Sequence, residues 1–262
     1  MAARWTLATV TVSAGLLVAC GAPSPLADMQ AGEEGRVVRI LDGDSLVLDT
    51  GQTVRLVGIE APSIGRRGAA NAPYAEDARR ALEDLAMGRR VRLYYPGLTR
   101  DRYDRALAHV HTEDQAGPPL WLNAELLKQG AVRARFYPDT DAGSQRLLDE
   151  ESEARRANRG LWRLSAYAAQ PAPTLKSDAR GFTLITATLG TSSPPSGPFA
   201  DRLACQRSVE GTPRRLDVRQ AAAAMCELAD GTRIEMRVWV SEAYFDLSHP
   251  LHVEILLQPG AD

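Results

Sequence analysis

The chain has 262 residues, of which 44% are hydrophobic and 24% are charged, and its 31 basic residues nearly balance its 33 acidic ones. This composition excludes a disordered polyampholyte tail and a strongly basic, histone-like protein. The length allows one large domain or two small domains, each with a hydrophobic core. Three cysteines are too few for a disulfide-rich scaffold.

The start of the chain is typical of an export signal. Arg4 precedes an uncharged, mostly apolar run that ends at Cys20 and is shorter than the roughly 20 residues needed to span a bilayer. The letters LVACG around Cys20 resemble a bacterial lipobox, in which that cysteine becomes the lipidated first residue. We therefore expect a lipoprotein signal peptide over residues 1–19, a tether over 20–35, and an exported protein anchored to a membrane of a bacterial cell envelope. A plain signal peptide cut nearby and a weak membrane anchor are alternatives.

Residues 36–165 alternate between strand and helix signals. Three short runs at hairpin spacing predict strands over Val37–Ile40, Ser45–Leu48 and Thr53–Val57, and two more strands are predicted over Val91–Tyr95 and Ala106–His111. Helical spacing of apolar residues and glycine stops predict helices over Tyr74–Met87, Leu122–Gln129 and Gln145–Asn158. Five strands interleaved with three helices, the first three strands contiguous, favour a small barrel of OB type.

The remainder divides into a linker over residues 166–180, rich in alanine and proline, and a β-rich unit over 181–262 of unknown role. Cys205 and Cys226 are the pair left if Cys20 carries lipid, and outside the cytoplasm we expect them to form a disulfide; two buried thiols are the alternative. The predicted fold class is thus α+β and mainly β: an OB-type five-stranded barrel with three helices, followed by a smaller C-terminal β-rich domain.

Four short features of the first unit could carry chemistry. Asp42-Gly43-Asp44 places two carboxylates at a turn, where they could hold a hard cation, although Asp-Gly is also an ordinary hairpin turn. Arg55 lies between apolar residues inside a strand, where a charge is costly unless it pairs or faces a site. Glu60 ends that strand, and the run from Asp101 to Arg105 is densely charged.

The order of these features resembles the staphylococcal nuclease (thermonuclease) family. Asp-Gly-Asp-Ser is followed by Val-Arg-Leu-x-Gly-Ile-x-Ala-Pro and Asp-x-Tyr-x-Arg-x-Leu-Ala, then by Asn123, Leu126 and Gly130, and finally by Gly160-Leu-Trp162. The resemblance covers residues 36–163, about half of the chain, and implies an OB-type barrel with three helices.

The resemblance also implies a calcium-dependent endonuclease, a hydrolase that cleaves the phosphodiester bonds of DNA and RNA. Asp44 and Glu60 then fall on the positions of the calcium ligands, with glutamate where the family usually has aspartate. Arg55 and Arg105 fall on the two arginines that clamp the phosphate. Two guanidinium groups and a divalent ion would stabilise the extra negative charge of the transition state.

Aromatic positions carry over as well. Tyr103 falls near a tyrosine that packs beside the nucleotide, and Phe136 and Tyr137 fall where the family places aromatic residues around the base. Stacking on such rings would be tolerant of base sequence. The resemblance therefore implies substrate contacts by all three residues.

Two positions depart from the family pattern. Ser63 stands where the family has the glutamate thought to activate the attacking water, and Asp104 replaces the glycine before the second arginine. Serine has no basic group at neutral pH, and a general base typically contributes about 10²–10⁴-fold. Two hypotheses follow: a working but weakened nuclease, or a catalytically degenerate domain that binds nucleic acid or protein at the envelope. An OB barrel that binds a saccharide or protein is a third.

Charge distribution bears on the partners. Residues 31–165 contain 21 bases and 21 acids, so weak non-specific binding to nucleic acid is expected. His109 and His111 are read as the polar face of a strand, and the acidic run over 139–153 as the exposed face of the last helix. The expected partners are a DNA or RNA substrate and a membrane reached through Cys20; no protein partner can be inferred.

Overall fold

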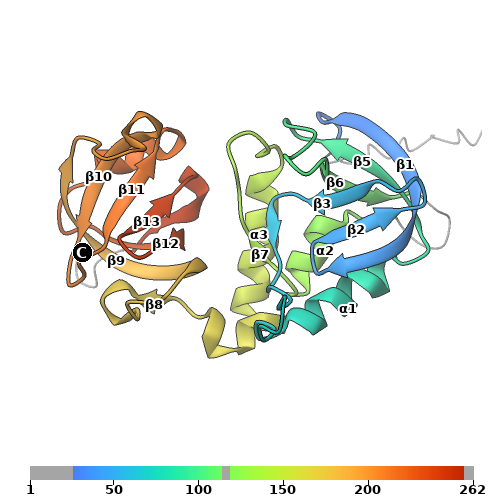
Figure 1. Ribbon diagram of the computed structural model, residues 1–262, viewed down its shortest axis with the longest axis horizontal. Coiled ribbons are helices and arrows are strands. Elements are labelled where there is room, and N and C mark those ends of the chain that lie inside the picture. Colours follow the sequence, from blue (N-terminus) through green and yellow to red (C-terminus); the bar gives the residue numbers. More distant parts are fainter. Residues whose placement is uncertain (1–25, 114–118, 257–262) are drawn as a thin grey trace, which may run out of the picture.

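The computed structural model describes residues 26–113 and 119–256, which form two lobes side by side (Figure 1). Five strands of the N-terminal lobe close into a barrel in the order β1-β2-β3-β6-β5. They are β1 (Gln30–Asp42), β2 (Ser45–Leu48), β3 (Thr53–Leu56), β5 (Arg90–Tyr95) and β6 (Ala106–Thr112). β3 and β6 pair in parallel, and the other neighbours pair antiparallel. The predicted barrel is confirmed.

Three helices pack against the barrel and complete its core: α1 (Ala75–Ala86), α2 (Leu122–Lys128) and α3 (Ser144–Arg156). In α1 the residues Ala78, Leu82 and Ala86 recur every four positions and are all buried, which explains why this segment is helical. A small ribbon pairs β4 (Ile59–Glu60) with β7 (Arg133–Ala134). The short 3₁₀ segments are η1 (Gly160–Arg163), η2 (Ser165–Tyr167), η3 (Ala172–Thr174), η4 (Ala200–Arg202), η5 (Gln220–Cys226) and η6 (Pro250–His252).

The expectation of a tether over residues 20–35 is wrong for its second half. β1 begins at Gln30, which pairs with Tyr95 of β5, and Leu26 and Met29 are buried in the core. Glu33 accepts a hydrogen bond from Arg100 at 2.6 Å, so this segment also has a partner distant in sequence. The expected signal peptide and Cys20 lie outside the described residues. No helix within 26–113 and 119–256 is long and apolar enough to cross a membrane.

The C-terminal lobe is a single highly curved sheet with the order β14-β12-β13-β11-β10-β9-β8. β12 also pairs with β9 over eight residue pairs, so the sheet returns on itself and encloses a second core. Its strands are β8 (Gln170–Pro171), β9 (Gly181–Ser193), β10 (Leu203–Val209), β11 (Arg215–Arg219), β12 (Arg233–Val240), β13 (Tyr244–Leu247) and β14 (Val253–Ile255). The β-rich character is confirmed, although sequence patterns did not indicate β10, β11 and β13.

The linker expected over residues 166–180 is wrong in the same way as the tether. β8 pairs in parallel with β9, and Ala172 is buried in the second core. A proline-rich stretch can add an edge strand because proline needs no ladder hydrogen bond on the open side.

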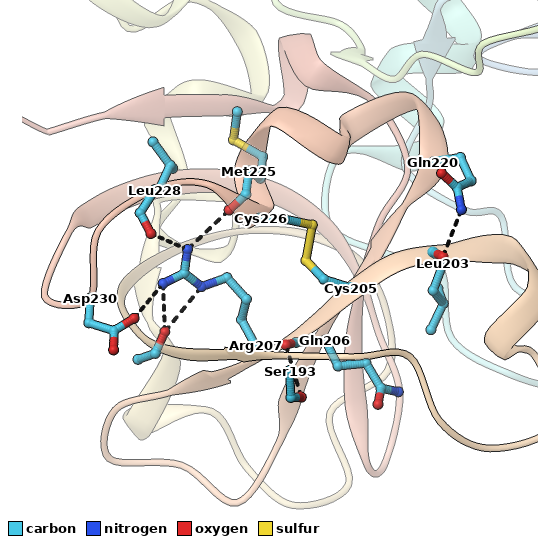
Figure 2. The surroundings of a disulfide bond; sticks show 11 residues. Ser193, Leu203, Cys205, Gln206, Arg207, Gln220, Met225, Cys226, Leu228 and Asp230 are labelled. Carbon is cyan, nitrogen blue, oxygen red and sulfur yellow. Dashed lines mark hydrogen bonds and ion pairs between the residues drawn. A yellow bond between two sulfur atoms is a disulfide. The ribbon is translucent and has the colours of Figure 1, made fainter.

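A disulfide joins Cys205 on β10 to Cys226 at the end of η5 (Figure 2). Beside it, the buried guanidinium of Arg207 donates hydrogen bonds to the carbonyl oxygens of Gly190, Met225 and Leu228 and pairs with Asp230 at 2.8 Å. Every guanidinium nitrogen of Arg207 thus has an acceptor, and these bonds offset the desolvation penalty of the buried charge. The two links together hold η5 against the sheet.

Buried and partly buried polar contacts join the two lobes. Glu151 of α3 is fully buried and pairs with Arg237 of β12, and Arg155 pairs with Glu235 at 2.8 Å. The backbone N–H of Phe136 donates to Nε2 of His252 at 2.9 Å. The reading of residues 139–153 as an exposed acidic face is therefore wrong for Glu151, since α3 lies between the barrel and the second lobe (Figure 1).

Candidate active site

A cavity of about 810 Å³ opens where the β1–β2 turn, the end of β3 and the loop before β6 meet. Its walls contain most of the residues that the family resemblance indicates. They are Asp44, Arg55, Glu60, Ser63, Tyr103 and Arg105. Residues from separate motifs along the sequence therefore surround one space, as a single site requires.

Asp44 is held at the base of this cavity by the tight turn between β1 and β2. Its side chain is buried; Oδ2 accepts the backbone N–H of Ala61 at 2.6 Å, and Oδ1 accepts the hydroxyl of Ser45 at 3.1 Å. Gly43 is required at the turn because a Cβ there would lie 2.7 Å from the Cβ of Ala78 on α1. The turn is thus packed against a helix, which fixes the direction of the Asp44 carboxylate.

Arg55 bridges two carboxylates. Its strand pairs with β2 so that Arg55 lies opposite Ser45, beside Asp44. The guanidinium pairs with Asp44 through Nη1 and with Oε2 of Glu60 through Nη2 at 2.7 Å. One cationic group therefore lies between the two carboxylates, and both face the same region of the cavity.

Glu60 has a second cationic neighbour that the sequence patterns did not indicate. Nη1 of Arg135 lies 3.0 Å from Oε2 of Glu60. The β4–β7 ribbon brings the two together, since it pairs Glu60 with Arg133 and the chain then continues to Arg135. Alternation of arginines over 133–135 was the available signal, but its meaning depended on a pairing of strands distant in sequence.

Arg105 is positioned by Asp101 at the base of a tight loop. The Asp101 carboxylate accepts the backbone N–H groups of Tyr103 and Arg105 and pairs with Nε of Arg105 at 2.7 Å. Burial raises the pKa of Asp101, but the hydrogen bonds from Arg105 and Tyr103 outweigh it and leave the pKa below its usual value. Asp101 therefore stays ionised and holds the Arg105 side chain at the cavity wall.

Asp104 does not act on the candidate site directly. Its backbone has φ of +62°, a conformation that glycine adopts more easily, and its side chain is 91% exposed. Its ion-pair partner is Arg100, at 3.9 Å.

The aromatic residues divide into exposed and buried groups. Tyr103 is 66% exposed at the cavity, and Tyr137 is 43% exposed beside Arg135. Phe136 is fully buried and stacks against the ring of His252 in the second lobe. The expectation that Phe136 contacts a nucleotide base is therefore wrong, because its ring belongs to the packing between the lobes.

Ser63 lies at the cavity wall and supplies no ionisable group. The carboxylates that line the cavity are Asp42, Asp44 and Glu60. Asp42 accepts the backbone N–H of Asp44 at 3.1 Å. Across the part of the chain that the structure describes, no three side chains of the His, Cys, Asp or Glu type form a metal-binding group.

His109 belongs to the core and not to a polar strand face. Trp121 donates its ring N–H to Nδ1 at 3.3 Å, so Nε2 carries the hydrogen and donates to the carbonyl of Ala142 at 3.0 Å. Burial lowers the pKa of His109 to about 4. The imidazole is neutral at neutral pH and has no role in the site.

Comparison with known proteins agrees with this geometry. The family model described as "Staphylococcal nuclease homologue" matches residues 53–164. A thermonuclease from Staphylococcus intermedius is 31% identical over 134 residues, which cover 50% of this chain and 77% of the relative. A micrococcal nuclease from Shigella flexneri is 38% identical over 137 residues, covering 49% of this chain and 72% of the relative. The barrel, the arrangement of its arginines and carboxylates, and these similarities together show that the chain belongs to the staphylococcal nuclease family.

Proposed function

We propose that this protein is a nuclease that hydrolyses phosphodiester bonds of DNA or RNA. The observation that carries the proposal is that Arg55, Arg105, Asp44 and Glu60 line one open cavity although they come from three separate motifs. The names of the similar proteins, thermonuclease and micrococcal nuclease, support the same activity. In this proposal Arg55 and Arg105 are the catalytic cations.

The two guanidinium groups suit a phosphodiester. A phosphate oxygen gains negative charge as the attacking oxygen approaches phosphorus, and forked N–H donors fixed in advance stabilise that charge. Arg55 is held by Asp44 and Glu60, and Arg105 is held by Asp101, so neither side chain must be ordered during the reaction. Tyr103 and Tyr137 are the exposed rings available to the sugar and base.

Calcium is part of the proposal. Asp44 and Glu60 offer hard oxygen ligands that converge on one guanidinium, so the donor chemistry suits Ca²⁺. Two carboxylates leave several coordination positions to water, backbone or substrate oxygens, and we expect weak affinity, with Kd on the order of 10⁻⁴–10⁻³ M. When bound, the ion would supply positive charge to a phosphate oxygen.

Water activation is the weak step of this site. Oε2 of Glu60 accepts a hydrogen bond from Arg55 and forms an ion pair with Arg135, and the Ser63 hydroxyl is not a base at neutral pH. Besides Asp44 and Glu60, the carboxylate that lines the cavity is that of Asp42, which already accepts a backbone N–H. We expect activity about 10²–10⁴-fold lower than with a well-placed glutamate.

A comparison of three proteins tests the activity. Wild type, Arg55→Ala and Ser63→Glu are assayed on single-stranded DNA and on RNA, each with calcium or with EDTA. Calcium-dependent cleavage by the wild type that Arg55→Ala abolishes supports a nuclease. An inactive wild type that Ser63→Glu activates supports the alternative, a degenerate nuclease-like module that binds its ligand without cleaving it. The observation that favours this alternative is the serine at the position of the family glutamate. Absence of both cleavage and binding in every variant refutes both.

We also propose that the protein is exported and held at the cell envelope through Cys20. The lipobox-like sequence supports an anchor, and the Cys205–Cys226 disulfide suits an oxidising compartment. Membrane fractionation of cells producing wild type or Cys20→Ser provides the test. A Cys20→Ser protein that remains with the membranes would contradict the lipid anchor.

A further inference from the structure

Three adjoining hollows run from the candidate active site to the C-terminal lobe. The 810 Å³ cavity shares Arg55, Glu60 and Arg105 with a second hollow of about 430 Å³. The second shares Arg135 and Tyr137 with a third of about 110 Å³, which Trp239 of β12 also lines. The C-terminal lobe therefore forms the far end of a groove that begins at the phosphate-binding arginines.

Exposed aromatic rings are concentrated along this groove. Tyr103, Tyr137 and Trp239 are 66%, 43% and 44% exposed and line its three hollows. Among the described residues, the other aromatic side chain that is more than a third exposed is Phe199, at 52%, and it lines none of the three. Exposed rings beside cationic side chains are the usual means of binding unpaired bases without sequence preference.

Strand alternation directs Trp239 outward. Its neighbours Val238 and Val240 are buried in the second core, so the Trp239 side chain lies on the opposite face of β12. On that face it stands beside Phe182 of β9, its register neighbour. The sheet thus presents the indole ring towards the groove and not towards the interior of its own lobe.

Arg135 links the indole ring to the active site. Its guanidinium carbon lies 4.9 Å from the ring centres of both Tyr137 and Trp239, while Nη1 pairs with Glu60. A cation held between two rings and anchored by a carboxylate keeps the rings in position before a ligand arrives. Prior positioning reduces the entropy lost when bases stack on the rings.

We propose that Trp239, together with Tyr137, is a base-stacking subsite through which the C-terminal lobe holds a single strand of nucleic acid beyond the bond being cleaved. The proposal rests on the proposed nuclease function, because the phosphate pocket determines where the strand starts. Its ligand is an unpaired strand, since bases inside a duplex do not expose the faces that stack on a ring. The C-terminal lobe then selects for strands long enough to reach from Arg105 to Trp239.

The test measures binding without cleavage and then kinetics. With EDTA present, the protein is titrated against a fluorescently labelled 12-nucleotide oligothymidylate and a labelled dinucleotide, and binding is followed by fluorescence anisotropy, which does not depend on Trp239. Trp239→Ala should raise the Kd of the 12-mer about tenfold and leave that of the dinucleotide unchanged. Trp239→Phe should retain most of the affinity, and Phe199→Ala, the matched exposed aromatic of the same lobe, should have no effect. With calcium, Trp239→Ala should raise KM for the 12-mer while kcat stays constant.

Each outcome is decisive. Equal affinity of wild type and Trp239→Ala for the 12-mer, with wild-type cleavage intact, overturns the subsite but not the nuclease. Length-dependent binding that needs Trp239, without cleavage, supports the subsite and refutes hydrolysis. A lower Tm for Trp239→Ala with unchanged binding assigns the ring to packing between the lobes and overturns the proposal, and absence of any binding and cleavage refutes both.

Discussion

The strongest structural prediction concerns the buried ion pair between the lobes. Both oxygens of Glu151 are used: Oε1 accepts the backbone N–H of Ala134 at 2.7 Å, and Oε2 pairs with Arg237. Glu151→Ala would leave a guanidinium that is only 7% exposed without its counter-ion. Breaking one partner of such a buried pair costs about 3–5 kcal/mol, because the remaining charge stays desolvated.

Urea unfolding followed by circular dichroism measures this cost. The matched control is Glu153→Ala, an exposed glutamate of the same helix, for which we expect a change within about 0.5 kcal/mol. The double variant Glu151→Leu/Arg237→Met removes both charges and should recover most of the lost stability. If Glu151→Ala is no more destabilising than Glu153→Ala, or if the double variant is worse than the single one, the assignment of this pair as the fastening between the lobes is refuted.

Three further predictions concern pH, calcium and the disulfide. Folding lowers the pKa of His109 from its ordinary value of 6.5 to about 4, so the unfolded chain is protonated first as the pH falls. The free energy of unfolding should therefore decrease between pH 6.5 and pH 4, by about 2 kcal/mol at pH 5. Urea titrations of His109→Gln should show a smaller dependence on pH. Calcium at 10 mM should add about 1.4 kcal/mol if Kd is about 1 mM, seen as a higher Tm that Asp44→Asn abolishes; an equal rise in Asp44→Asn would exclude this site. Cys205→Ser/Cys226→Ser should lose about 3 kcal/mol, and unchanged stability would contradict a structural role.

The barrel and its helices could be predicted from the sequence because their signals are local. Val54 and Leu56 alternate with polar residues over Thr53–Leu56, and Ala78, Leu82 and Ala86 recur every four positions; both patterns indicate which face is buried, and the structure agrees. The turn at Asp42-Gly43-Asp44 and the strand around Arg55 carry the candidate phosphate and metal ligands within short motifs. Such motifs are recognisable in sequence because a tight turn or a strand end restricts both residue type and direction.

Tertiary structure decided what depends on pairing between distant segments. Phe136 and Tyr137 are adjacent in sequence, yet one ring is buried against the second lobe and the other faces the groove. Glu151 was predicted to be exposed, but α3 lies between the two lobes and Glu151 pairs with Arg237. Residues 30–35 were predicted to be a tether, but they pair with β5. The order of short motifs identified the nuclease-like half of this protein, whereas the burial of a side chain, and the meeting of Arg135 with Trp239, depend on which surfaces pack together and therefore on the complete fold.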